Sequence, residues 1–350
     1  MTKKLYLSSG YVNWEYIDSL PVTFVAVIGG RGTGKTYGLL DYQHKNYPNE
    51  RYMFMRRLET QVEKLTIPEY SPYEQLNIDN GWSYQIVPRG KGGGYATYHM
   101  VENEDGKMVP EGSPVAAVAS LSTFSTIRGT GGASFQKFFF DEFIKQPEEK
   151  PIKEEGFVLL HAYETLNRNR EFSGLKPIKM YMLANSNNFV NPVFKELGIM
   201  SEVEKMYKAG MDVKIFEDRG LAVIILRDSP ISEKKAETAI YRLAGRKSRF
   251  ATISLDNDFI IEDVRVRSAP IKEYRPMVRL GEITIYRHKS SMRYYATQHS
   301  SGRCPEYGIS EMQIKKFRAE QRWAIDLILR DKLEYENYWT YAMLTETLKP

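Results

Sequence analysis

A glycine-rich segment at residues 29–36 carries the strongest chemical signal in the sequence. Its pattern is G-x-x-x-x-G-K-[ST], made by Gly29, Gly30, Arg31, Gly32, Thr33, Gly34, Lys35 and Thr36. Glycines let a backbone bend round a phosphate with its N–H groups pointing inward, and a following helix N-terminus adds positive potential. The lysine of this motif reaches the β- and γ-phosphates, and the hydroxyl of its last residue is a ligand for Mg²⁺. We therefore predict a site for ATP and Mg²⁺; a site that binds nucleotide without hydrolysing it fits the same pattern.

A pair of acids offers the group that hydrolysis needs. Residues 138–140 are three phenylalanines, which predict a short buried strand, and Asp141 and Glu142 follow directly. We assign Asp141 to the Mg²⁺ shell and Glu142 to the role of general base that polarises the attacking water. The alternative is a solvated acidic loop.

Basic and polar residues after two further elements complete the predicted machinery. Arg168 and Arg170 follow a predicted helix at 157–166, and an arginine that reaches a neighbouring subunit's γ-phosphate stabilises transition-state charge. We prefer Arg168 for this role; a helix end stabilised by its dipole explains both arginines as well. Asn185 and Ser186 follow a predicted strand at 178–183 and suit a polar sensor of the attacking water, although loop polarity explains them almost as well.

The elements that must position these residues alternate along the chain. Apolar runs predict strands at 23–28, 51–55, 138–140, 178–183 and 221–226, with short alternating strands between 83 and 120 and helices at 35–45 and 157–166. Such alternation favours an α/β fold with a largely parallel sheet. Beyond residue 230 the pattern predicts a polar helix at 233–243, strands at 277–280, 283–286 and 293–297, and an amphipathic helix at 311–329. We therefore predict a P-loop ATPase domain at 1–228, a helical linker at 229–257 and a small α+β domain at 258–350.

Composition and charge narrow the class of protein. Hydrophobic residues make up 42% and charged residues 27% of the 350-residue chain, which excludes a mostly disordered or fibrous protein. The apolar runs are too short to span a bilayer, the first ten residues lack the apolar core of a secretory signal, and the one cysteine, Cys304, cannot form an internal disulfide; we expect a cytosolic protein without a membrane partner. From Arg227 onward there are 23 Lys and Arg against 17 Asp and Glu, a net charge of +6, whereas residues 1–226 carry −1. A basic module beside a neutral one indicates a polyanionic partner, although a basic solvated surface is the simpler reading.

At these residues the chain resembles the genome-packaging ATPases of small, protein-primed tailed bacteriophages, which are relatives of the terminase large subunit. The resemblance rests on the P-loop with its internal Arg31 and on four further segments, 140–144, 167–171, 184–192 and 254–260. It covers most of the first 260 residues and is weaker beyond them.

The resemblance implies a RecA-like, additional-strand ATPase core with a catalytic glutamate. Asp141 and Glu142 match the family's metal-binding and catalytic acids, Arg168 its trans-acting finger, and Asn185 its coupling motif. Arg128 falls where the family has a second trans-acting basic residue, which is a lysine there. The family forms a ring, apparently a pentamer, on the portal (connector) of an empty capsid and drives double-stranded DNA inward. The implied location is the host cytoplasm, with transient docking on the viral procapsid, and a structural packaging RNA is a further partner in some members.

Contacts with nucleic acid are open to more than one assignment. Where the family can carry a DNA-gripping lysine this chain has Glu59, so the contact falls to Lys64 or to the loop 89–94, whose Arg89 and Lys91 suit phosphate contacts. The loop also fits a plain hairpin tip. A further basic cluster contains Arg246, Lys247 and Arg249.

The carboxy-terminal domain resembles a ribonuclease-H-like nuclease that has lost its activity. Such a nuclease needs several carboxylates for two metals, and only Glu273 and Glu282 are acidic between 265 and 303. We expect this domain to bind DNA or RNA without cutting it. Tyr286, Tyr294 and Tyr295 fit either stacking on RNA bases or packing within a small sheet.

Two other functions fit parts of the pattern. Another ring ATPase acting on nucleic acid, such as a helicase or a replication initiator, would use the same P-loop and acids. A non-enzymatic, nucleotide-gated assembly protein would use the P-loop alone. Near the amino terminus Tyr11, Trp14 and Tyr16 suit either a shelter for adenine or a place in the core.

Overall fold

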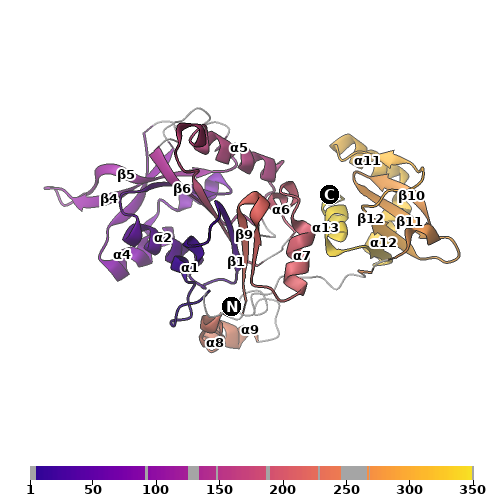
Figure 1. The fold of residues 1–350 in the computed structure, drawn as a ribbon, viewed down its shortest axis with the longest axis horizontal. Coiled ribbons are helices and arrows are strands. Elements are labelled where there is room, and N and C mark those ends of the chain that lie inside the picture. The colour runs from indigo at the N-terminus through magenta and orange to yellow at the C-terminus, as the bar shows by residue number, and fades with distance from the viewer. Residues whose placement is uncertain are drawn as a thin grey trace. The chain divides into compact units, whose positions relative to one another are not determined.

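The chain folds into two compact units, Met1–Ile260 and Ile261–Pro350. Figure 1 shows them in a computed structural model that describes residues 5–90, 94–124, 134–146, 149–186, 190–227, 229–245, 266–267 and 269–348. None of the helices within these ranges is long and apolar enough to cross a membrane. The domain limits predicted from the sequence, including the linker at 229–257, stay predictions.

A nine-stranded sheet organises the first unit, in the order β3-β4-β5-β2-β6-β7-β1-β9-β8. The strands are β1 (Phe24–Gly29), β2 (Arg51–Arg56), β3 (Tyr84–Pro88), β4 (Tyr95–Glu102), β5 (Met108–Ser120), β6 (Phe135–Asp141), β7 (Lys179–Ala184), β8 (Val213–Phe216) and β9 (Leu221–Leu226). The six strands from β5 to β9 in this order pair in parallel, and antiparallel strands occupy both edges. The prediction of an α/β fold with a largely parallel sheet is confirmed.

The strand β7 lies between the two strands that carry the predicted phosphate chemistry. It pairs with β1, where Val27 lies opposite Leu183, and with β6, where Asp141 lies opposite the same Leu183. This inserted strand is the additional strand that the resemblance implied. Because parallel strands end at one edge of a sheet, the loop after β1 and the acids after β6 meet there.

Helices cover both faces of the sheet, which explains why its central strands are apolar on both sides. On one face pack α1 (Trp14–Asp18), α2 (Lys35–Asn46), α3 (Glu59–Lys64) and α4 (Glu74–Asn80). On the other pack α5 (Glu155–Asn167), α6 (Pro192–Glu196) and α7 (Met200–Lys208). In Figure 1 α1, α2 and α4 gather on one side of β1, and α6 and α7 lie on the other. The result is a three-layer unit whose P-loop edge is rigidly supported.

The polar helix predicted at 233–243 is wrong in its extent. The chain forms two short helices, α8 (Pro230–Ala236) and α9 (Ala239–Ala244), separated at Thr238. Thr238 adopts an extended backbone as the residue before α9, and its hydroxyl donates to the carbonyl of Lys235. This side-chain bond occupies a carbonyl that a continuous helix would use, so the first helix stops there.

The second unit contains a five-stranded sheet in the order β13-β10-β11-β12-β14. Its elements are β10 (Tyr274–Leu280), β11 (Ile283–His288), β12 (Tyr294–Thr297), β13 (Glu306–Tyr307), β14 (Leu333–Tyr335), α11 (Glu311–Glu320), α12 (Arg322–Leu329) and α13 (Tyr338–Thr347). The three predicted strands are confirmed with small shifts at their ends. The likeness to a ribonuclease-H-like nuclease stays a prediction.

The single helix predicted at 311–329 is also wrong. It breaks at Gln321, whose backbone leaves the helical region. The Gln321 amide donates to the Tyr307 hydroxyl at 2.9 Å and accepts from the Trp323 indole at 2.8 Å. These two bonds hold the bend, which turns Ala324 of α12 into the core of the unit.

Candidate functional site

The glycine-rich loop forms the tight turn between β1 and α2 that its sequence predicts. Gly32 and Gly34 have φ of 71° and 86°, in the left-handed region that favours glycine. Lys35 begins α2, and its ammonium group turns back under the loop, where it donates to the carbonyls of Gly29 and Gly30 at 2.8 and 2.7 Å. Lys35 therefore occupies two carbonyls of the loop.

The ammonium of Lys35 lies in an unusually dry place. The residue is 7% exposed, and this burial lowers the pKa of Lys35 to about 7, although the Asp141 carboxylate opposes the change. A buried ammonium gains most from an anion that replaces its lost water. The loop is thus prepared for a negatively charged ligand.

Asp141, predicted to bind Mg²⁺, and Glu142, predicted to activate water, line the same cavity as this loop. Asp141 is buried at the end of β6, and the Thr36 hydroxyl lies 3.1 and 3.0 Å from its two carboxylate oxygens. A carboxylate beside a hydroxyl, open to phosphate oxygens, matches the way proteins bind Mg²⁺, which prefers few protein ligands and keeps substrate phosphates and water. The residues present therefore fit that cation.

Glu142 follows in a strained conformation. Its φ of 60° is rare for a residue with a side chain, and its N–H donates to Asp141 Oδ1 at 3.1 Å. The Glu142 side chain is 31% exposed, whereas that of Asp141 is 4% exposed, and both residues line the same cavity. Strain of this kind persists where the surrounding structure holds it, and here it separates the two neighbouring acids into a buried one and an accessible one.

Arg56 is a site residue that the sequence analysis did not assign. It ends β2, which pairs with β6, and its Nη1 and Nη2 lie 2.6 Å from Glu142 and 3.0 Å from Asp141. Burial and the Glu142 charge raise the pKa of Asp141, whereas Arg56 lowers it. The one signal in the sequence was the place of Arg56 at the end of a predicted strand.

The adjacent Arg57 has a different role. Its side chain is fully buried and forms ion pairs with Glu149 at 2.6 Å and Glu155 at 2.5 Å. Arg56 thus serves the site, whereas Arg57, the first residue after β2, holds the start of α5 through Glu155. The structural role of Arg57 is to position the helix that precedes Arg168.

Asn185, which the sequence predicts as a polar sensor, lies beside the loop, and its sensor role stays a prediction. It follows β7, and its Oδ1 lies 3.3 Å from Lys35 Nζ. Together these groups line a cavity of about 450 Å³ that contains Arg31, Gly32, Gly34, Lys35, Thr36, Tyr37, Arg56, Asp141, Glu142, Ala184 and Asn185. Ser186, the alternative sensor, is buried.

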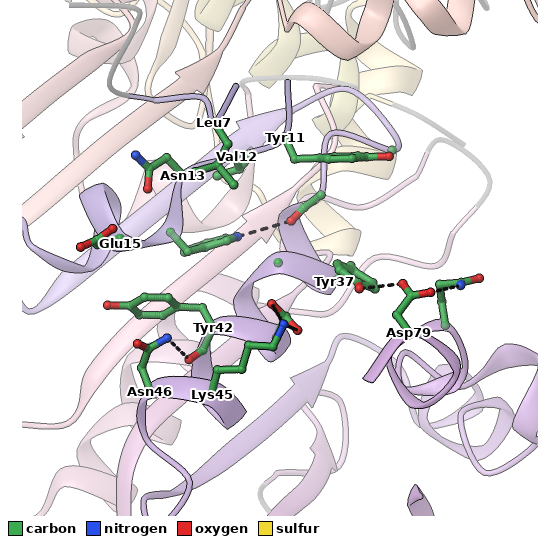
Figure 2. A pocket seen from close by; sticks show the side chains of 16 residues that line it. Leu7, Tyr11, Val12, Asn13, Glu15, Tyr37, Tyr42, Lys45, Asn46 and Asp79 are labelled. Atoms are coloured by element: carbon green, nitrogen blue, oxygen red, sulfur yellow. Dashed lines mark hydrogen bonds and ion pairs between the residues drawn. The ribbon is translucent and has the colours of Figure 1, made fainter. Parts of the chain in front are cut away.

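A second cavity of about 870 Å³ adjoins the first and shares Gly32, Gly34 and Tyr37 with it. Figure 2 shows Tyr11 on one side of this space and Tyr37, which donates to Asp79 at 2.8 Å, on another. Trp14 is buried and donates to the Gly34 carbonyl at 3.4 Å, and Tyr16 packs against the core. Of the three aromatic residues predicted as an adenine shelter, Tyr11 is the exposed one: the residue is 45% exposed and lines the cavity.

The remaining predicted residues lie away from this cavity or beyond the described residues. Arg168 follows α5 with φ of 43° and is not among the residues that line the described phosphate cavity. Lys64 at the end of α3 and Arg89 after β3 are exposed. Five predicted residues fall outside the described ranges: Lys91, Arg128, Arg246, Lys247 and Arg249.

Comparison with known proteins shows which solved structures have a fold similar to that of this chain. No family model and no curated protein matches the chain. Among solved structures, the bacteriophage Phi-29 viral genome packaging motor assembly matches with a TM-score of 0.66 and 18% identity, over 97% of this chain and 99% of that one. The chain has the fold of a phage packaging motor ATPase.

The Phi-28 gp11 DNA packaging motor matches similarly, with a TM-score of 0.61 and 17% identity over 98% of this chain and 99% of the other. The crystal structure of the N-terminal domain of the DNA packaging ATPase from bacteriophage phi29 matches 63% of this chain and 97% of its own, with 22% identity and a TM-score of 0.44. The packaging-ATPase fold that the motifs implied is confirmed by the first two comparisons, and at these identities they concern the fold.

Proposed function

We propose that this protein is an ATP hydrolase that moves double-stranded viral DNA into a preformed capsid. The proposal rests on the contact between the Thr36 hydroxyl of the P-loop and the carboxylate of Asp141 at the end of β6, a strand that β7 separates from β1. Glu142 lies next to them. This arrangement separates metal binding from water activation, as ATP hydrolysis requires. The packaging motors of Phi-28 and Phi-29 have the same fold.

The residues of the site divide the work of hydrolysis among them. The backbone N–H groups of the loop and the Lys35 ammonium bind and orient the phosphates. Thr36 and Asp141 would hold Mg²⁺, which would neutralise the charge that develops on the phosphates. Glu142 accepts hydrogen bonds from the attacking water, and Asn185, through its contact with Lys35, senses whether the lysine is engaged with phosphate.

Arg56 adds a control on this step. While its guanidinium pairs with Glu142 Oε2, that carboxylate oxygen is occupied. A shift of Arg56 away from Glu142 would free Oε2 for the attacking water. Gln61 Nε2 lies 3.4 Å from the same Glu142 oxygen and 2.8 Å from Glu149, so it donates to the oxygen that also pairs with Arg56.

The partners and the location follow from the motor interpretation. We propose a homo-oligomeric ring, with Arg168, and also Arg128, reaching the neighbouring subunit's phosphates. The basic residues Lys64, Arg89, Lys91, Arg246, Lys247 and Arg249 contact DNA phosphates. We propose that the ring is a pentamer and that its partners are the capsid portal and a structural packaging RNA. The proposed location is the host cytoplasm, with docking on the procapsid.

The deciding experiment compares wild type with Glu142→Gln for ATP binding and for phosphate release, without DNA, with double-stranded DNA and with single-stranded DNA. The motor interpretation expects retained binding with hydrolysis lower by about 10²–10⁴-fold, the usual contribution of a general base. Lys35→Ala serves as the control that loses binding itself.

The two competing functions predict different results in the same experiment. A helicase or replication initiator would be stimulated by single strands in preference to duplex DNA. A nucleotide-gated assembly protein would release no phosphate in wild type, and Glu142→Gln would leave its function intact. Either result would reject the packaging motor.

A further inference from the structure

A second lysine reaches the phosphate-binding loop from α8. The Lys235 ammonium donates a hydrogen bond to the backbone carbonyl of Arg31, 204 positions away. Its aliphatic chain covers Gly32, since a Cβ built on that glycine would lie 3.2 Å from Nζ and 3.4 Å from Cε. Lys235 therefore contacts the loop at Arg31 and Gly32, next to the two carbonyls that the buried Lys35 holds.

Two ammonium groups thus occupy three successive carbonyls of the loop. Lys35 donates to Gly29 and Gly30, and Lys235 donates to Arg31. The two ammonium groups at one loop repel each other, and an anion between them would offset this repulsion. Their positions therefore suit a polyphosphate.

The start of α8 is held in place by contacts that do not involve Lys235. Ser229 donates to the Gly10 carbonyl at 3.1 Å, and the Tyr6 hydroxyl donates to the Arg227 carbonyl at 2.6 Å. Gly10, with φ of 91°, comes so close that an added Cβ would lie 2.9 Å from the nitrogen of Ile231. These contacts hold the start of α8 in place. Lys235, which bonds to Arg31, lies near the other end of this helix.

We propose that Lys235 is a phosphate-binding residue of the ATP site, whose ammonium engages a β- or γ-phosphate oxygen and draws α8 over the bound nucleotide. The inference rests on the proposed function, because it requires that the loop bind ATP. A lysine ammonium has three donors on a flexible stem, so it can turn from a carbonyl to a phosphate without moving the backbone far. The choice of phosphate follows from its place beside Gly32 and Lys35, since a P-loop lysine reaches the β- and γ-phosphates.

The test measures nucleotide affinity by calorimetry in a Glu142→Gln background, so that hydrolysis does not intervene. With Mg²⁺ present, Lys235→Met should weaken ATP and ADP binding by about 10- to 100-fold, the effect of one charge-assisted hydrogen bond, and leave AMP binding unchanged. Lys235→Arg should retain most of the affinity. Lys234→Met is the matched control, because it removes the same charge from the exposed neighbouring position of α8 and should change nothing.

A second readout does not depend on affinity. Hydrogen exchange of the α8 amides should slow when ADP or ATP binds to the protein with Lys235, and should not slow in Lys235→Met. A loss of AMP affinity equal to that of ATP would mean that Lys235 only supports the loop, and would overturn the inference. Unchanged ATP affinity in folded Lys235→Met, as judged by its melting temperature, would overturn it as well.

The same experiment separates this inference from the proposed function. If the Glu142→Gln protein with its native Lys235 binds no ATP, the proposed function itself fails. If that protein binds ATP and Lys235→Met or Lys235→Gln binds it equally well, only the role of Lys235 fails.

Discussion

Arg56 Nη1 lies 2.6 Å from Glu142 Oε2, so the residue assigned to water activation is held by an arginine of its own subunit. The second nitrogen of the same guanidinium lies 3.0 Å from Asp141. Arg56 thus pairs with two neighbouring acids, one of them buried.

Replacing Arg56 should leave the negative charges of Asp141 and Glu142 without the guanidinium that pairs with both. We expect Arg56→Met to lower the free energy of unfolding by about 3 kcal/mol without nucleotide, since a partner of a buried carboxylate is lost. Mg²⁺ with ADP should raise the melting temperature of the variant more than that of wild type, because the cation replaces the missing charge. Thermal melts of both proteins, with and without Mg²⁺ and ADP, check this. Equal stabilisation of the two proteins would contradict the role of Arg56 as a charge partner of the acids.

Mixing inactive subunits tests whether Arg168 acts across an interface. Arg168→Ala and Glu142→Gln proteins should each lose ATPase activity, and their mixture should recover part of it, because some interfaces then combine an intact Glu142 with an intact Arg168. Phosphate release by the mixture is the measurement, with ring assembly verified by light scattering. A parallel mixture with Arg170→Ala decides between the two arginines: recovery there and not with Arg168→Ala would transfer the role to Arg170.

Salt dependence of DNA binding tests the basic contacts. Each lysine or arginine that neutralises one DNA phosphate contributes about one unit to the slope of log affinity against log salt concentration. Lys64→Ala and Arg89→Ala should therefore each lower the slope for duplex DNA by about one, with little dependence on sequence. Lys208→Ala, which removes an exposed lysine paired with Glu204 on α7, is the control. Unchanged slopes for both variants would move the DNA contact elsewhere.

Tyr11 should contribute to nucleotide affinity through its ring. Because it borders the cavity that adjoins the P-loop and packs on Gly34, we expect Tyr11→Ala to raise the KM for ATP by about 2- to 10-fold with kcat unchanged, the size of one aromatic contact. Tyr11→Phe should behave as wild type. Steady-state kinetics of both variants are the check, and a change confined to kcat would show that Tyr11 acts on the chemistry.

His44 makes the stability of the first unit depend on pH. Burial lowers the pKa of His44 to about 4, and its Nε2 contacts the Tyr52 hydroxyl at 3.0 Å. In the unfolded chain the imidazole takes up a proton near pH 6.5, so the folded state keeps its full stability above that pH and loses it as the pH falls toward 4. The expected loss is about 3 kcal/mol in total.

Urea unfolding at a series of pH values between 7.5 and 4.5 measures this dependence. His44→Gln should flatten the curve, whereas His161→Gln, which removes an imidazole that is 43% exposed, should leave it as in wild type. A pH dependence that survives in His44→Gln would assign it to other groups.

The sequence alone determined the parts of this protein that depend on near neighbours along the chain. The P-loop was readable because its glycines, the preceding apolar strand and the following helix are contiguous, and their backbone conformations follow from residue type. Asp141 and Glu142 were readable for the same reason, as acids that directly follow a buried strand. Within those segments the predicted positions agree with the structure.

Only the tertiary structure decided which distant segments meet. The pairing of β2 with β6 brought Arg56 to Glu142, and the return of α8 brought Lys235 to Gly32, over separations that no local pattern encodes. The helices predicted at 233–243 and 311–329 broke because side-chain hydrogen bonds, one of them to Tyr307 of another element, outweighed a helical periodicity worth little by itself. Contacts between segments far apart in the chain arise from burial of the whole sheet and its helices. These long-range contacts, more than the P-loop motif, determine which charged side chains surround the phosphate site.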